Sequence, residues 1–191
     1  MDAVVKSGHV MSTRAILTYD DYTALPGDGR RYEIHEGHLS VTPAPSPRHQ
    51  KVIVNLLGIL DRYVKAHGLG EVYVSPIDCI LSPTTVVQPD IIYVGLDRLG
   101  SVSHRGIEGA ATLAIEVLSA STADIDRRTK LQLYAKHGVP YYWMVDPDAR
   151  VIDAYRAVAD HYEPAGPLEG VTPGTLPPFP ELPLEPAGLW S

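Results

Sequence analysis

Two carboxylates stand inside apolar runs of the sequence. Asp90 lies within residues 87–92, and Glu116 lies within residues 113–118. A carboxylate on a buried strand is costly unless it pairs with a cation or coordinates a metal ion. If the two acids converge, they can hold a divalent ion, and metal-assisted hydrolysis of a phosphodiester is the chemistry that such a site supports. Edge-exposed or salt-bridged acids are the alternative.

A lysine follows the second acid at a spacing that could bring the two side chains together. If a strand over 112–119 turns back into a helix over 123–137, Lys130 lies about 10 Å along that helix at 1.5 Å per residue. Glu116 lies about 10 Å back along the strand at 3.3 Å per residue. The two side chains could therefore lie level, with Lys130 polarising the attacking water or the scissile phosphate. The alternative is an exposed lysine paired with Asp126, one helical turn earlier.

The first elements have clear boundary signals. Thr18, followed by Asp21, is typical of a capping box for a short helix. Residues 31–34 and 39–42 flank a glycine turn and predict a hairpin. A longer helix is expected from Pro47 to His67, because Ser46 can cap it, Gly68 can end it, and apolar residues recur between them at helical spacing.

The remaining elements are read from apolar runs and turn residues. They are strands 71–75, 77–82 and 86–94, a loop over 95–110, a strand over 112–118, a helix over 123–137, and a hairpin of 141–145 and 151–155. Both central acids are thus expected within strands. The aromatic residues Tyr141, Tyr142, Trp143 and Tyr155 are expected to pack the last hairpin.

Length and composition indicate one α/β domain with two tails. The chain has 191 residues, 45% of them hydrophobic, which is enough for one substantial core. We expect a flexible arm over 1–17, the domain over 18–162, and a proline-rich tail over 163–191 that lies extended on the surface.

The charge balance constrains what the chain can bind. A formal net charge of -7 argues against sequence-independent binding of nucleic acid, because such binding requires a basic surface. Nucleic-acid binding would therefore need a metal ion, a partner or a local basic patch. The candidates for such a patch, which could equally be solvated surface, are Arg127, Arg128 and Lys130, together with Arg98, His104 and Arg105.

The cellular setting is expected to be the cytoplasm. Cys79, the single cysteine, cannot form an internal disulfide, and its apolar alternation gives it a packing role and no catalytic one. No apolar run is long enough to span a bilayer, and the N-terminus lacks a signal-peptide pattern. His35 and His38 are too few and too closely spaced to predict a zinc site.

Four fragments together carry a family resemblance. They are Gln88-Pro89-Asp90, Glu116-Val117-Leu118-Ser119, Asp126-Arg127-Arg128-Thr129-Lys130, and residues 138–146. In this order and spacing the chain resembles the Uma-type restriction endonuclease family of the PD-(D/E)xK nuclease superfamily. The resemblance implies a restriction-endonuclease-like core, which is a mixed sheet flanked by helices, with Asp90 and Glu116 as ligands of Mg²⁺ or Mn²⁺.

The resemblance also bears on individual positions. The superfamily places a lysine two residues after the second acid, but Leu118 stands there, and Lys130 is the natural substitute. Glu33 is similar to the family's N-terminal glutamate, which would complete the metal site or orient water, unless it is a plain hairpin acid. His49 matches a family histidine and would contact phosphate or a catalytic carboxylate, unless it is simply exposed.

Three functions remain open. The leading one is a metal-dependent endonuclease that hydrolyses nucleic acid, with DNA the expected substrate and a homodimer favoured because each chain has one site. The second is a non-catalytic binding or assembly module of the same fold, which Leu118 and the negative charge favour. The third is a hydrolase of small phosphodiesters.

Overall fold

The computed structural model describes residues 15–119, 125–170 and 172–190. Its elements, in chain order, are α1 (Tyr19–Thr23), β1 (Arg31–His35), β2 (His38–Thr42), α2 (Pro47–His67), β3 (Gly70–Val74), β4 (Cys79–Ser82), β5 (Thr85–Val87), β6 (Ile91–Gly95), the 3₁₀-helix η1 (Leu96–Ser101), β7 (Val102–Ser103), β8 (Gly106–Glu108), β9 (Leu113–Val117), the π-helical η2 (Ile125–Lys130), α3 (Leu131–Lys136), β10 (Tyr141–Asp146), β11 (Val151–Val158), β12 (His161–Glu169), β13 (Gly174–Leu176), β14 (Phe179–Leu184) and α4 (Pro186–Leu189).

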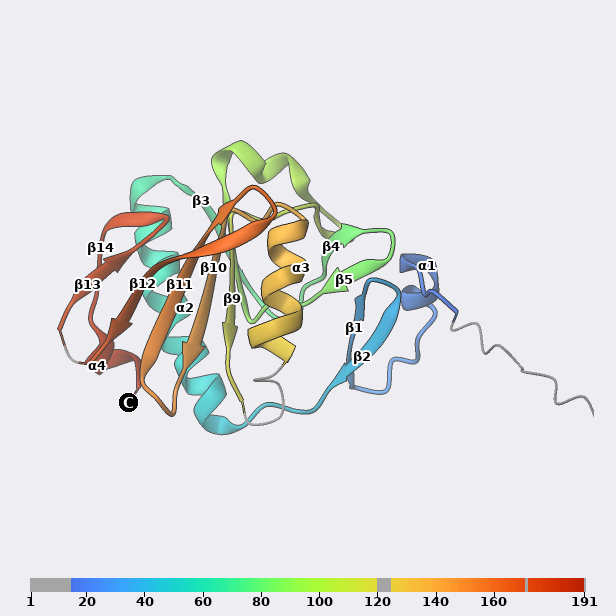
Figure 1. Ribbon diagram of the computed structural model, residues 1–191, viewed down its shortest axis with the longest axis horizontal. Coiled ribbons are helices and arrows are strands. Elements are labelled where there is room, and N and C mark those ends of the chain that lie inside the picture. The colour runs from blue at the N-terminus through green and yellow to red at the C-terminus, as the bar shows by residue number, and fades with distance from the viewer. Residues whose placement is uncertain (1–14, 120–124, 171, 191) are drawn as a thin grey trace, which may run out of the picture.

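A mixed six-stranded sheet forms the centre of the molecule. Its order is β12-β11-β10-β9-β6-β3, and β9 and β10 run parallel while the other neighbours are antiparallel. Helix α2 covers one face and α3 the other (Figure 1). The expected mixed sheet flanked by helices is therefore confirmed.

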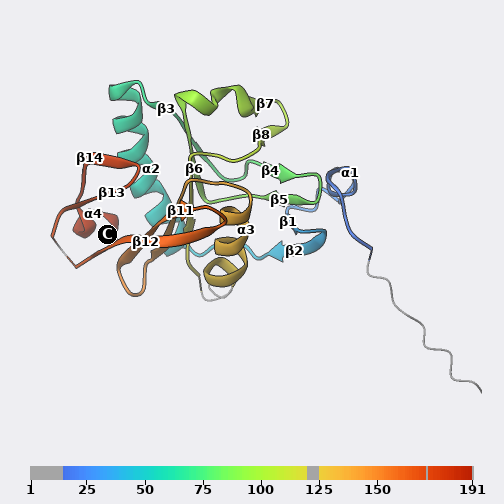
Figure 2. The same cartoon turned by 45° about the horizontal axis from the view of Figure 1, so that its top comes forward.

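A second six-stranded sheet stands beside α3 (Figure 2). Its order is β2-β1-β5-β4-β8-β7, so the N-terminal hairpin joins strands from the middle of the chain. One core cluster fills the space between both sheets and α3, with Cys79 and Ile107 from the second sheet, Tyr142 from the central sheet and Tyr134 from α3. This shared core fixes the two sheets against each other.

Helix α2 packs its apolar stripe on the other face of the central sheet. Its buried residues include Val52, Leu56 and Leu60, and its limits are those that the sequence predicts. The Ser46 hydroxyl accepts from the His49 N–H, and Gly68 ends the helix in the left-handed conformation. No helix among the described residues is long and apolar enough to cross a membrane.

The expected single strand over 86–94 is wrong. Strand β5 belongs to the second sheet and β6 to the central one, and the chain crosses between them at residues 88–90. Pro89 has no N–H to donate to a ladder, which disfavours a continuous strand here. Asp90 therefore stands just before β6 and not within a strand.

Two further expectations need correction. The loop over 95–110 contains η1, β7 and β8. The tail after Pro164 does not lie extended on the surface, because β12 crosses the expected boundary at 162 and pairs with β11, and β13, β14 and α4 follow. Buried apolar residues at irregular spacing, Phe179 and Leu189 among them, join the core with α2, a pattern that no single period reveals.

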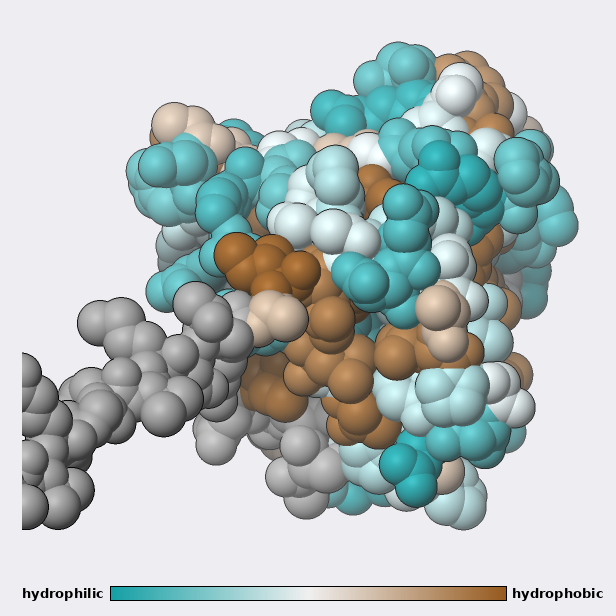
Figure 3. Space-filling view, turned by 90° about the vertical axis from the view of Figure 1, so that its right-hand side faces the viewer, coloured by the Kyte–Doolittle hydropathy of each residue, from teal (hydrophilic) through white to brown (hydrophobic). Residues whose placement is uncertain are grey.

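One face of the molecule carries exposed apolar side chains. Figure 3 shows apolar surface on the side formed by α1 and the β1–β2 hairpin. The large apolar residues exposed in this region are Ile16, Leu39 and Val41. Leu39 and Val41 lie on β2, which is an edge strand of its sheet.

The buried C-terminal segment makes a direct stability prediction. Phe179→Ala should lower the free energy of unfolding by about 3–5 kcal/mol, because the ring is buried among Trp143, Tyr93 and Tyr63. Val54→Ala, on the exposed face of α2, should change it by less than about 0.5 kcal/mol. Urea unfolding followed by circular dichroism measures both, and equal small losses would contradict the core role of the tail.

Candidate active site

Asp90 is buried where the chain passes from one sheet to the other. Its Oδ1 lies 3.1 Å from Arg31 Nη1, and its Oδ2 lies 3.2 Å from His49 Nε2. The same Oδ2 accepts a hydrogen bond from the Val117 backbone N–H at 2.9 Å. Asp90 is thus tied to β1, α2 and β9.

Glu116 lies on β9, next to Asp90. Strands β6 and β9 pair antiparallel with Ile91 opposite Ile115, which brings the two acids to the same end of the pair. Glu116 Oε1 accepts hydrogen bonds from Lys130 Nζ at 2.9 Å and from Tyr134 Oη at 2.7 Å. Its carboxylate is therefore fixed by the helical segment that follows β9 in the chain.

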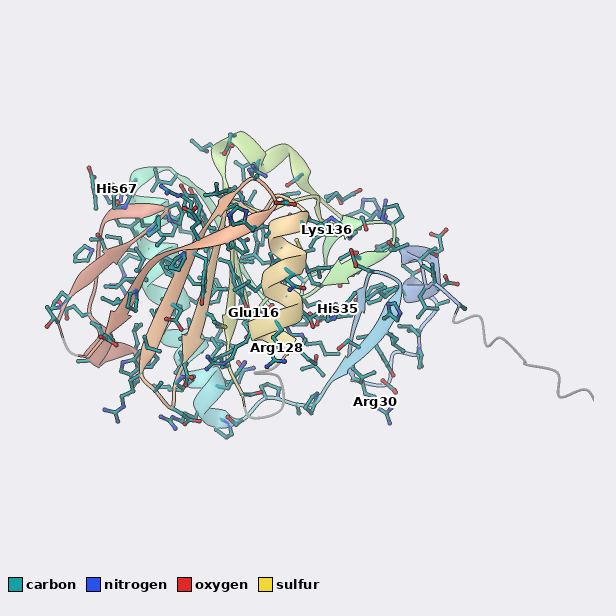
Figure 4. The ribbon with its side chains drawn as sticks, in the orientation of Figure 1. Arg30, His35, His67, Glu116, Arg128 and Lys136 are labelled. Atoms are coloured by element: carbon teal, nitrogen blue, oxygen red, sulfur yellow. The ribbon has the colours of Figure 1, made fainter. Side chains whose placement is uncertain are left out.

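Lys130 is buried at the end of η2. Its ammonium also donates to Glu33 Oε1 at 3.2 Å, so one cation joins two acids. The expected level position of Lys130 and Glu116 is confirmed, and the alternative of an exposed lysine is wrong. Figure 4 shows Glu116 beside this helical segment. The side chain of Asp126 lies outside the described residues.

Glu33 projects inward from β1. Its Oε1 also accepts from the Gln88 backbone N–H at 2.7 Å, and its Oε2 lies 3.1 Å from His35 Nε2. Because strand residues alternate between faces, Arg31, Glu33 and His35 share one face of β1. The hairpin thus supplies Glu33 with its partner His35, and it also supplies Arg31, which pairs with Asp90.

The exposed fractions show how deeply these groups are placed. They are 1% for Glu33, 2% for Glu116, 3% for Asp90, 4% for Lys130 and 7% for His49. His49 is therefore not the exposed histidine that was the alternative, and it contacts a carboxylate as expected. All five candidate residues with described side chains are brought together.

The surroundings shift several pKa values. Burial raises the pKa of Asp90, but the His49 hydrogen bond and the Arg31 charge outweigh it and the net shift is downward. Burial likewise raises the pKa of Glu33, and Lys130 and His35 outweigh it. Folded-state pKa values below the ordinary ones mean that both acids stabilise the fold at neutral pH. That stability is lost as the pH falls below 4.5 for Glu33 and 3.8 for Asp90.

A cavity of about 370 Å³ opens onto these groups. Its lining includes Asp90, Glu116, Lys130 and His49, together with the connector over 42–46 and residues 147–148. Two acids and a lysine therefore face one space that a phosphate-sized group can enter. Among the described residues, no group of three or more His, Cys, Asp or Glu is arranged to hold a metal ion.

Sequence reasoning missed two participants. Arg31 lies two residues before Glu33, and the strand alternation that places Glu33 inward also places Arg31 there. Tyr134 lies four residues after Lys130, on the same side of a helix. Burial raises the pKa of Tyr134 further above its ordinary value, so its hydroxyl stays protonated and donates to Glu116.

The two expected basic groups do not form one patch. Helix η1, which carries Arg98, lies at the top of Figure 1, and Arg105 packs over the Tyr19 ring of α1, whereas η2 lies toward the bottom. Lys130 is buried, so it is not part of a surface patch. Cys79 is also away from the cavity walls, and burial raises its thiol pKa to about 12, as suits a packing residue.

The fold and the buried cluster define a class. A mixed sheet flanked by helices, with acids at the ends of neighbouring strands and a lysine beside them, is the arrangement of a restriction-endonuclease-like protein. The family model Uma2, described as "Putative restriction endonuclease", matches residues 19–187, and the chain belongs to this family.

One solved structure supports the fold. It is "a putative nuclease belonging to DUF820 from Anabaena variabilis ATCC 29413", with a TM-score of 0.75 and 22% sequence identity, covering 91% of this chain and 97% of that chain. No curated protein matches the chain.

The contribution of the Lys130 ion pairs to stability can be measured directly. Lys130→Met should lower the free energy of unfolding by about 3 kcal/mol or more, because it leaves Glu33 and Glu116 without their common cation in a buried site. Lys136→Met, six residues on and exposed, is the matched control and should change it by less than about 0.5 kcal/mol. Thermal unfolding at neutral pH measures both, and a harmless Lys130→Met would contradict the structural role of the ion pairs.

Proposed function

We propose that this protein is a metal-dependent endonuclease that hydrolyses DNA phosphodiester bonds. The observation that carries the proposal is a pair of buried acids, Asp90 and Glu116, at adjoining strand ends. Lys130 donates a hydrogen bond to Glu116, and both acids line the same cavity. Structural ion pairs alone do not require the acids to face an open space. Membership of the Uma2 family supports the same function.

The donor set fits a magnesium ion. Mg²⁺ is commonly held by one or two carboxylates, and water and substrate phosphate supply the remaining oxygens. Asp90 and Glu116 are the two buried carboxylates that line the cavity. The bound ion would make its water more acidic and neutralise charge on the phosphate. The lack of a three-ligand cluster among the described residues is compatible with such a site.

The other residues have roles that follow from their contacts. Lys130 Nζ is held between Glu33 and Glu116, where it can donate to a phosphate oxygen or to water. It reaches this place from the following helical segment, so a lysine at the position of Leu118 is not needed. Arg31 and His49 fix the orientation of Asp90.

One observation favours the non-catalytic alternative. Asp90 already contacts Arg31 and His49, and Glu33 and Glu116 share Lys130. An ion would have to compete with these cations. A binding module that retains the fold needs no such competition, so metal affinity separates the two functions.

Metal binding and cleavage are measured together. Calorimetry with Mn²⁺ and Mg²⁺ should give saturable binding that Asp90→Asn and Glu116→Gln each abolish. Plasmid cleavage should fall by more than about a hundredfold in both variants, since losing even an outer-shell partner of a ligand costs about 10–100-fold. Asp97→Asn, an exposed acid just after β6, is the control and should behave as wild type.

The results discriminate among the candidate functions. A folded wild type that binds no metal and cuts no DNA would overturn the nuclease and leave the binding module. Hydrolysis of bis(p-nitrophenyl) phosphate without plasmid cleavage would indicate a small-phosphodiester hydrolase.

We also propose a symmetric homodimer. Cutting both strands of a duplex with one site per chain favours two-fold symmetry, and the exposed apolar residues Leu39 and Val41 on the edge strand β2 supply a self-complementary contact. Light scattering should give twice the chain mass for wild type and the chain mass for Leu39→Ser with Val41→Ser. The exposed Val54→Ser on α2 should remain dimeric, and a monomeric wild type would contradict the proposal.

A further inference from the structure

Arginines from separate parts of the chain surround the cavity. Arg31 and Arg48 line its walls. Arg48, at the start of α2, also donates to the Pro147 carbonyl at 2.5 Å and pairs with Asp148. Arg48 is half exposed, whereas Arg31 is largely buried and its guanidinium binds Asp90 and the Gln88 carbonyl.

A second cavity continues the surface past the connector. It measures about 510 Å³ and shares Arg31 and residues 42–45 with the first. Arg30 lines this second cavity but not the first, and its side chain is 68% exposed. Positive charge therefore extends outward beyond the space that holds Asp90 and Glu116.

Two further arginines lie on η2, and one of them contacts Asp146 near the cavity. Arg127 Nη2 lies 2.7 Å from Asp146 Oδ2, and Asp146 is two residues before Asp148, which lines the first cavity. Arg128 follows directly and is exposed. In Figure 4, Arg128 lies at the lower end of the helical segment that carries Lys130, and Arg30 lies farther along the lower side of the view.

We name the four exposed or half-exposed arginines, Arg30, Arg48, Arg127 and Arg128, the arginine rim. The rim is notable because the chain as a whole carries a net charge of -7. Asp28, Asp148 and Asp146 pair with Arg30, Arg48 and Arg127. Ion pairs that are partly exposed contribute about 0–1 kcal/mol, so phosphate groups can replace these aspartates at little cost.

We propose that the arginine rim binds the backbone phosphates of a DNA strand on both sides of the bond that the acids attack. The inference rests on the proposed nuclease function and adds the residues that bind its substrate outside the cavity. A small phosphodiester would fill the first cavity alone and leave Arg30 without a role. A polynucleotide has regularly spaced phosphates that can reach from Arg30, across the acids, to Arg128.

Salt-dependent DNA binding tests the rim. The variants are Arg30→Ala and Arg128→Ala, with Arg62→Ala as control because it causes the same change in net charge. Arg62 is exposed and lies on the same helix as Arg48, about 21 Å farther along it at 1.5 Å per residue. Anisotropy of a short fluorescein-labelled DNA duplex is followed over a salt series, with Ca²⁺ replacing Mg²⁺ to prevent cleavage, and plasmid cleavage in Mg²⁺ is followed in parallel.

We expect each rim variant to weaken binding several-fold at low salt. The slope of log Kobs against log salt should also become shallower by about 0.9 for each phosphate that the variant no longer binds, while Arg62→Ala matches wild type. If all three variants bind DNA as tightly as wild type, and wild type cleaves plasmid, the rim proposal is overturned and the nuclease proposal stands. Rim-dependent binding without cleavage in Mg²⁺ or Mn²⁺ overturns the nuclease and leaves the rim. A wild type that neither binds nor cleaves DNA overturns both.

Discussion

The structure depends on a single buried ammonium. Lys130 Nζ lies between Glu33 on β1 and Glu116 on β9, so one cation compensates acids from two different sheets. Removing water from three charged groups is costly, and only close, hydrogen-bonded pairing offsets that cost. Tyr134 and the Gln88 N–H satisfy further oxygen lone pairs. The two sheets must therefore keep a fixed separation wherever this cluster is intact.

The crossing at Gln88-Pro89-Asp90 adds a second set of contacts to this cluster. The Gln88 N–H binds Glu33 and its carbonyl accepts from Arg31, while Asp90 accepts from Arg31 and from the Val117 N–H. Backbone groups that would pair within a sheet are used here to bind side chains. The result is that Asp90, at the crossing, and Glu116, on the central sheet, line the same cavity.

The C-terminal segment stabilises the site indirectly, because it packs against α2. Phe179, Leu184 and Leu189 belong to the same core cluster as α2 and the central sheet, and Asn55 of α2 donates to the Gly188 and Leu189 carbonyls. Helix α2 is thus held by the C-terminal segment as well as by the central sheet. Its first turn presents Arg48 and His49 to the cavity, so the tail stabilises an element on which the site relies.

The sequence by itself determined the elements with local signals, namely the capped α1, the β1–β2 hairpin and α2, because caps, turns and helical periods act over a few residues. Together with the family resemblance it also named Asp90, Glu116, Lys130, Glu33 and His49. Only the tertiary structure decided that Asp90 stands at a crossing between sheets, that Arg31 and Tyr134 hold the two acids, and that the proline-rich tail is part of the core. These features are contacts between residues far apart in the chain, and no local pattern encodes which distant partner a buried charge or an irregularly spaced apolar residue will meet.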